Sequence, residues 1–181
     1  SRMIALPPTI RIFPLGEVVL FPDTLLPLHV FEPRYRKLVA DALQDDRTVG
    51  MVLIRGADGP VAPAPPDRPD RPAVYAVGCA GRIVEHEPLE DGRSTIVLRG
   101  AVRFRIRHEL EVADPYRVVE AQALYEAPIP AEHMRPWRDE LRVLVGDYVA
   151  ALSGDRAAVD KLFARLDLEG LVNYLSASLP L

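Results

Sequence analysis

The hydrophobic residues of this 181-residue chain change their spacing near Pro128 and Pro130. Before this point, short β-branched runs are separated by Gly, Pro and Asp, which is typical of strands. After it, apolar residues recur every three or four positions, which is typical of amphipathic helices. The spacing therefore predicts an α+β protein with a β-rich unit over residues 10–125 and a helical unit over residues 130–181.

The β-rich part contains one strand with a clear period of two, Ala101 to Glu109, in which apolar residues alternate with arginines. Such alternation buries one face of a strand and exposes the other. Asp91-Gly92 lies between two further runs, 83–86 and 95–98, and this dipeptide favours a hairpin turn. Strands are also expected over 49–55 and 118–125, with a bulge near Gly78 and Gly81.

One helix is expected inside this part, beginning at Glu32-Pro33, because proline at the first helical position loses no hydrogen bond. Apolar residues follow at helical spacing and should cover the sheet. They are Tyr35, Leu38, Val39, Ala42 and Leu43.

The C-terminal third is predicted to be a small helical bundle that docks through a buried Trp137. A first long helix carries Trp137, Leu141, Leu144, Val145, Tyr148 and Leu152. Gly154 should end it, and Asp155 can cap a second helix. A third helix is expected over residues 168–179.

Residues 56–72 contain six prolines together with Gly, Ala, Asp and Arg. This composition cannot bury a core and favours extended, solvated chain, so the segment is predicted to be a mobile loop. A Pro-rich ligand for an SH3-like partner is the alternative interpretation.

Composition argues against several classes of function. A net charge of −4 gives the chain as a whole no attraction to nucleic acid or anionic membranes. No stretch approaches the roughly 20 apolar residues that span a bilayer. The single cysteine, Cys79, cannot form an internal disulfide, which makes a reducing, cytoplasmic location the default expectation.

The residue patterns of common catalytic sites are missing from the sequence. There is no glycine-rich phosphate loop, and the only lysines are Lys37 and Lys161, both on predicted helices. The four histidines are scattered singly, without the spacing that metal ligation favours. We therefore expect no enzyme activity, no cofactor and no metal site, with an unrecognised hydrolase as a remote alternative.

Two runs of sequence resemble a known family. Residues 13–22, FPLGEVVLFP, and residues 26–35, LPLHVFEPRY, are similar to the opening signature of Lon protease N-terminal domains. Later blocks around Arg82-Ile83-Val84, Asp91-Gly92-Arg93 and residues 98–106 resemble that family in the right order. The resemblance is strong over about residues 10–125 and extends to the later helices only in kind.

The resemblance implies a PUA-like β-barrel and a protein-recognition role, as in Lon proteases and the similar domain of cereblon. It suggests a free-standing member, because the 181 residues include no ATPase or protease domain. From the residues themselves, the signature side chains are expected to be mainly structural, with a binding surface as the alternative. They are Phe21, Pro22, Leu26, Pro27, Leu28, Phe31, Glu32, Arg34 and Tyr35.

Two functions follow from different features. The leading hypothesis is a module that offers a sheet edge, or a groove between barrel and bundle, to unfolded or extended protein segments, with a separate protease or ATPase as a further partner. The alternative is RNA binding through an arginine stripe. The stripe comprises Arg99, Arg103, Arg105 and Arg107, and Glu109 and Glu111 are expected to continue the same face and weaken it.

Overall fold

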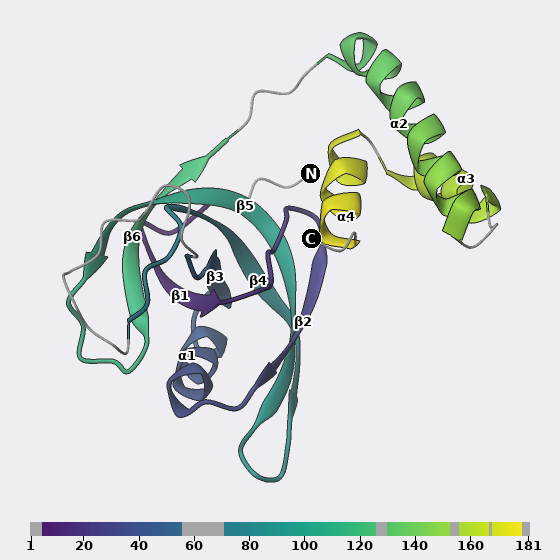
Figure 1. The fold of residues 1–181 in the computed structure, drawn as a ribbon. Helices are drawn as coiled ribbons and strands as arrows, with labels where there is room; N and C mark the ends of the chain where they lie inside the picture. Colours follow the sequence, from purple (N-terminus) through teal and green to yellow (C-terminus); the bar gives the residue numbers. More distant parts are fainter. Residues whose placement is uncertain (1–4, 56–70, 126–129, 153–155, 167, 179–181) are drawn as a thin grey trace. The chain divides into compact units, whose positions relative to one another are not determined.

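The computed structural model describes the chain except residues 1–4, 56–70, 126–129, 153–155, 167 and 179–181 (Figure 1). Most of the expected Pro-rich loop and the expected cap Asp155 lie outside the described residues. The chain divides into two compact units, Ser1–Tyr125 and Glu126–Leu181, and each is described separately below.

The described part of the first unit contains six strands and one helix, and that of the second contains three helices. The strands are β1 Thr9–Leu15, β2 Leu25–Val30, β3 Thr48–Leu53, β4 Val77–Pro88, β5 Ser94–Leu110 and β6 Arg117–Leu124. The helices are α1 Pro33–Leu43, α2 Ala131–Leu152, α3 Arg156–Arg165 and α4 Leu168–Ser178. The predicted α+β class is confirmed.

The six strands form one mixed sheet in the order β2-β5-β4-β3-β1-β6. A further pairing between β5 and β6 closes five of these strands into a barrel-like ring. Strands β1 and β3 are parallel, and the other neighbours are antiparallel. Strand β2 stays outside the ring and pairs with the first half of β5, along the hairpin that extends past the ring in Figure 1.

Strand β5 unites two segments that the sequence predicts as separate strands. It is a single strand of 17 residues that includes Gly100. Its register with β4 is irregular opposite Ala80 and Gly81, and its register with β6 is irregular between Ile106 and His108. Glycine is required at position 100, since a Cβ there would lie 1.9 Å from the carbonyl oxygen of Phe21. The hairpin turn lies where Asp91-Gly92 predicts it, and Gly92 has a φ of 82°.

The core of this unit has two layers on opposite faces of the sheet. One fills the ring around the fully buried Phe104, and the other lies between the sheet and α1. Tyr35 of α1 stacks on Phe13 of β1 with ring centroids 4.0 Å apart. Helix α1 begins at Pro33, as predicted, and it covers the sheet with its buried residues.

A buried ion-pair cluster lies where β5 meets β6. The side chains of Arg117 and Glu109 are 7% and 2% exposed, and Arg117 donates to both carboxylate oxygens at 3.0 and 2.8 Å. Arg71 also contacts Glu109 at 3.0 Å, and Arg117 donates to the carbonyl of Pro72. The cluster thereby ties the chain just after residue 70 to the ring.

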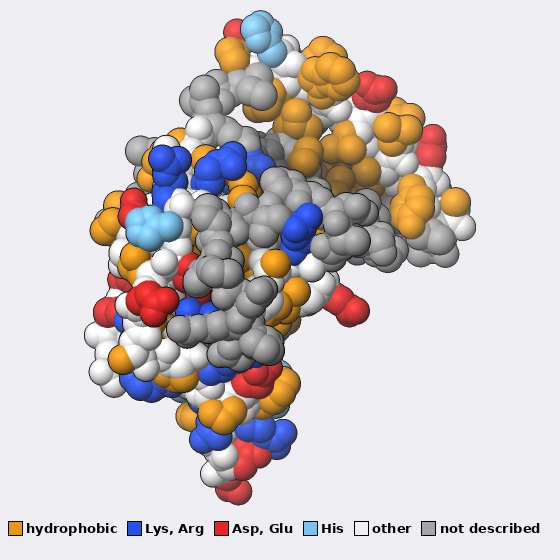
Figure 2. Space-filling model, turned by 60° about the vertical axis from the view of Figure 1, so that its left-hand side comes forward, with side chains coloured by type: hydrophobic (Ala, Val, Ile, Leu, Met, Phe, Trp, Pro, Cys, Tyr) orange, Lys and Arg blue, Asp and Glu red, His pale blue; other side chains and the backbone are white. Residues whose placement is uncertain are grey.

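The helical unit has a small core of its own. Val159, Phe163 and Leu171 are buried there, and Leu141 and Val145 of α2 pack against them. Trp137 does not join this core, and its side chain is 67% exposed. Trp137 is therefore not buried within the bundle itself, and docking of the bundle through this residue stays a prediction. Figure 2 shows hydrophobic side chains gathered on the surface of this unit.

Candidate functional site

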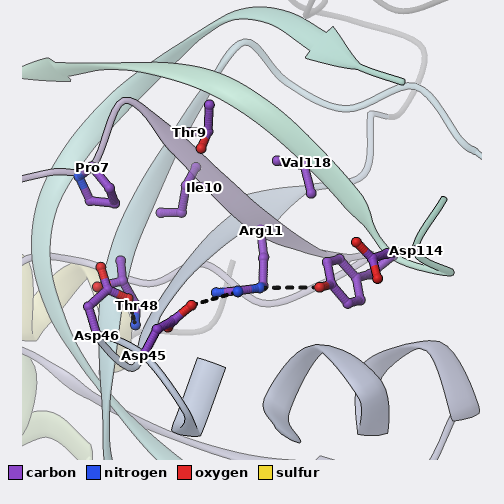
Figure 3. Close-up of a pocket in the computed structure, with 10 residues that line it drawn as sticks. Pro7, Thr9, Ile10, Arg11, Asp45, Asp46, Thr48, Asp114 and Val118 are labelled. Carbon is purple, nitrogen blue, oxygen red and sulfur yellow. Dashed lines mark hydrogen bonds and ion pairs between the residues drawn. The ribbon is translucent and has the colours of Figure 1, made fainter. Parts of the chain in front are cut away.

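A pocket of about 410 Å³ in the β-rich unit is lined mainly by polar residues (Figure 3). Arg11 of β1 lies across it and contacts Asp45 at 2.6 Å and the hydroxyl of Tyr116 at 3.3 Å. Tyr116 in turn donates to Asp41 of α1 at 2.6 Å. The remaining lining residues are Pro7, Thr9, Ile10, Asp46, Thr48, Asp114 and Val118.

Arg11 and Asp45 of this pocket are paired with each other, and Tyr116 connects Arg11 to Asp41 of α1. Hydrogen bonds from Lys37 and then Tyr116 hold the pKa of the Asp41 carboxyl below its ordinary value. Lys37 lies 2.7 Å from that carboxylate. These contacts link the helix to β1 and to the segment before β6, so the network is best explained as an attachment of α1 to the barrel.

Groups suited to nucleophilic or metal chemistry are not assembled in the described residues. Burial raises the pKa of the Cys79 thiol to about 12, which keeps it protonated and unreactive. Across the described ranges, no cluster of three or more His, Cys, Asp or Glu side chains is placed to hold a metal ion. Nor does any described helix have the length and apolar character to cross a membrane.

Strand β2 presents an exposed row of mostly apolar side chains. Leu25 is 57% exposed, Pro27 and His29 are exposed as well, and Leu26, Leu28 and Val30 face the core beneath α1. Phe31 directly follows the strand, is 57% exposed and stacks on His29 with ring centroids 5.9 Å apart. We call Leu25, Pro27, His29 and Phe31 the β2 row.

The main chain of β2 also has a free side. Within the part of the chain that the structure describes, β2 pairs only with β5. The N–H of Gly100 donates to the carbonyl of Thr24, so the main chain of Thr24 points toward β5. In an antiparallel pair, the main-chain groups of successive residues point alternately toward and away from the partner strand. The main-chain groups of Leu25, Pro27 and His29 therefore point away from β5. Pro27 has no N–H, which limits how long a strand could pair there.

The signature residues thus have different roles. Tyr35 is buried, Leu28 packs against the core, and Glu32 pairs with Arg34 at 2.9 Å at the start of α1. Phe21 and Pro22 are half-buried in the connection between β1 and β2. Phe31 and Pro27 lie on the surface, where the alternative interpretation of the signature as a binding surface applies to them.

The arginines expected to form one stripe lie on two faces of the sheet. Arg99 is opposite Arg82 on β4, whereas Arg103 is opposite Cys79. Since Cys79 and Arg82 are three positions apart on β4, their side chains point to opposite faces. A β-bulge at Ala101, which has no partner on β4, therefore separates Arg99 from Arg103, Arg105 and Arg107.

The irregular register between Ile106 and His108 changes which charged residues lie on the arginine face. After it, Glu109 is opposite the buried Val119 and its carboxylate joins the buried cluster, so it does not continue the arginine face as expected. His108 and Glu120 pair with each other on the surface at 3.2 Å. Arg107 donates to the side-chain oxygen of Gln122 at 3.2 Å. The arginine face therefore loses Glu109 and gains His108 and Glu120.

A small apolar groove lies beside Arg103. It has a volume of about 110 Å³ and runs between the chain at Val18 to Phe21 and strands β3 and β4. Met51 and Cys79 form its buried floor, and Val77, 37% exposed, lies at its rim. The sequence gives no local signal for this groove, because four separated segments form it.

Comparison with known proteins places this fold in a family. The sequence model of the ATP-dependent protease La (LON) substrate-binding domain matches residues 9–180. Lon protease 2 of Syntrophobacter fumaroxidans is 31% identical over 121 residues, which are 67% of this chain and 14% of that protein. Lon protease of Parabacteroides distasonis is 31% identical over 110 residues, covering 60% and 12%. The chain thus spans about one seventh of the length of these relatives.

Two solved structures share the fold. The N-terminal domain of Mycobacterium avium complex Lon protease superposes with a TM-score of 0.71 at 14% identity, over 96% of this chain and 84% of that one. The Lon N-terminal domain protein from Xanthomonas campestris gives a TM-score of 0.51 at 23% identity, over 95% and 99%. With a match that extends through both units, the chain belongs to the ATP-dependent protease La (LON) substrate-binding domain family.

Proposed function

We propose that this chain is a non-catalytic module that binds unfolded or extended segments of other proteins. The observation that carries the proposal is the β2 row, in which Leu25 and Phe31 are each 57% exposed beside a free strand edge. Exposed apolar groups grouped in this way favour association with apolar side chains of a partner. Main-chain groups of the edge add hydrogen bonds that tolerate many sequences.

The family match supports a recognition role, because its description is that of a substrate-binding domain. The absence of catalysis is supported by the engaged charges of the polar pocket and by the protonated, buried Cys79. Lys37, one of two lysines, is held by Asp41. Purified protein should therefore turn over neither ATP nor casein.

The partners in this proposal are a client polypeptide and a separate protease or ATPase that processes it. The relatives named above are proteases several times longer than this chain, which supports cooperation between recognition and proteolysis. A cytoplasmic location is part of the proposal, since the single cysteine is buried as a free thiol.

The β2 row can be tested with paired serine substitutions. We expect Leu25→Ser with Phe31→Ser to weaken binding of a permanently unfolded polypeptide about tenfold, through the loss of apolar contacts. Both side chains are mostly exposed, so the thermal unfolding midpoint should stay within a few degrees of the wild-type value. Fluorescence anisotropy titrations measure the affinity.

Val143→Ser with Leu144→Ser is the control, because these side chains are 55% and 60% exposed on α2, in the other unit. It also replaces two exposed apolar side chains by serine and should leave the affinity unchanged. Equal affinities for Leu25→Ser with Phe31→Ser and the wild type would exclude the β2 row as the binding surface.

RNA binding is the second candidate function, and the grouping of Arg103, Arg105 and Arg107 on one exposed face favours it. The contact of Arg107 with Gln122 and the pairing of His108 with Glu120 reduce the number of groups on this face that are ready to meet phosphates. The net charge of −4 also opposes it.

A further inference from the structure

The free edge of β2 is uncharged. Residues 24–31 contain no Asp, Glu, Lys or Arg, although these types make up 27% of the chain. Exposed edge strands are commonly protected from pairing by charged side chains or by proline. Over residues 24–31, Pro27 is the only such protection. The edge is therefore open to another strand, and the strand that fits it best is uncharged.

Both faces of β2 offer apolar contacts beside this edge. On the outer face, Leu25 and Phe31 are each 57% exposed. On the face toward α1, Leu26 and Leu28 are only half-buried, although their partners on the neighbouring strand β5 are fully buried. The edge position of β2 accounts for this difference, because no strand covers the far side of Leu26 and Leu28. A strand added to the edge would therefore contact apolar side chains on both of its faces.

Pro27 determines how many main-chain hydrogen bonds the edge can form. Its main chain points to the free side, as do those of Leu25 and His29. An added strand can donate to the Pro27 carbonyl, but its own carbonyl receives no bond in return, because proline has no N–H. Pairing of two β2 edges would lose such a bond at both prolines and leave two carbonyls without donors. A segment that keeps all its N–H groups therefore pairs better than a second copy.

We propose that the β2 edge binds a client segment as an added strand, that this segment is a continuous run of uncharged apolar residues, and that Pro27 limits its affinity. The inference rests on the proposed function and deepens it, since it names the class of segment and the pairing mode. Continuous apolar runs form strands that are covered on both faces in folded proteins. Such strands become accessible only when those proteins unfold.

Two isomeric peptides test the preference for a continuous run. Both contain the same valines, leucines and serines, with the apolar residues consecutive in one isomer and alternating with serine in the other. We expect the consecutive isomer to bind the full chain about tenfold more tightly in fluorescence anisotropy titrations, because it makes apolar contacts on both faces. Equal affinities of the two isomers would overturn the stated class of client.

Methylation of main-chain nitrogens in the consecutive peptide tests strand pairing while the side chains stay the same. Two N-methyl groups on alternate residues block one edge of an extended peptide, whereas two on adjacent residues block both edges. The first peptide can turn its intact edge to β2 and should bind nearly as well as the unmodified one. The second should bind about tenfold more weakly. Equal affinities of the two methylated peptides would rule out strand addition.

Replacing Pro27 by alanine adds the missing N–H to the edge. We expect Pro27→Ala to bind the consecutive peptide about fivefold more tightly, because one hydrogen bond is gained. Pro115→Ala is the matched control, since Pro115 is an exposed proline of the same unit outside β2, and it should leave the affinity unchanged. Unchanged or weaker binding by a folded Pro27→Ala variant would overturn the role of Pro27. The peptide experiments use the wild-type chain and do not depend on this variant.

Sedimentation velocity separates a client from a second copy at the same edge. We expect no dimer of the wild-type chain that the consecutive peptide dissociates, and observing one would overturn the choice of occupant. Failure of the proposed function would look different, because a permanently unfolded polypeptide and both unmodified isomers would then fail to bind. If the unfolded polypeptide binds but the position of the methyl groups has no effect, this inference fails and the proposed function stands.

Discussion

Replacing Glu109 by alanine is expected to lower the free energy of unfolding of the β-rich unit by about 3–5 kcal/mol. The carboxylate is 2% exposed and accepts hydrogen bonds from Arg117 and Arg71. Its removal leaves the guanidinium of Arg117, itself 7% exposed, buried without its counter-charge. A buried unpaired charge is among the most destabilising consequences of a single substitution. Urea unfolding followed by circular dichroism measures the change.

Two variants make this result specific. Glu120→Ala removes a carboxylate on the neighbouring strand β6 that pairs with His108 on the surface. This change should lower the free energy of unfolding by less than about 1 kcal/mol. Replacing Glu109 by leucine together with Arg117→Met removes both charges and should recover much of the loss. If Glu109→Ala and Glu120→Ala had equal effects, the burial described for Glu109 would be wrong.

Phe163→Ala is expected to destabilise the helical unit by about 3–5 kcal/mol, because it empties the centre of a small core. Phe163 is 4% exposed and packs with Val159 and Leu171 between α2, α3 and α4. Few other residues that the structure describes in this unit are buried, so the loss should unfold it in water. Hydrogen exchange of the amides in α2 and α3 should become fast in this variant, and amides of the ring should stay protected.

Trp137→Ala is the control for this experiment. Trp137 is 67% exposed, and its removal should change stability by no more than about 0.5 kcal/mol. A large loss on replacing Trp137, with little effect of Phe163→Ala, would show that the helices pack through the face that the apolar spacing first suggested.

Local signals in the sequence account for several elements of the fold. Helix α1 begins at Pro33, where proline at the first helical position predicts it. The β4–β5 hairpin turns at Asp91-Gly92, because Gly92 adopts the positive φ that such turns require. In each case, the residues that make the prediction are also those whose backbone adopts the structure.

Features that depend on distant partners could not be predicted in this way. The bulge at Ala101 exists only through the pairing of β5 with β4, and it places Arg99 and Arg103 on opposite faces. Likewise, the spacing of apolar residues defines the apolar face of α2 but not the part of it that α3 and α4 cover. Leu141 and Val145 are covered, whereas Trp137 and Leu144 remain exposed.

The β2 row illustrates the same limit at the candidate site. Its residues belong to a run of apolar positions that favours a core interpretation, and alternation along β2 does bury Val30. Only the position of β2 outside the ring leaves Leu25 on the surface, and Phe31 is exposed directly after the strand. Topology, and not composition, makes this segment a candidate surface.

The central claim, that the chain recognises unfolded protein, is tested most directly by calorimetric titration with a permanently unfolded polypeptide of no net negative charge. Titrations at two salt concentrations and several temperatures should give weak salt dependence and a negative heat-capacity change, because burial of apolar surface drives binding. A stably folded protein of similar size and net charge should not bind. Absent binding of the unfolded chain, together with single-stranded RNA binding whose log–log salt slope is about 0.7 per phosphate contact, would contradict the claim.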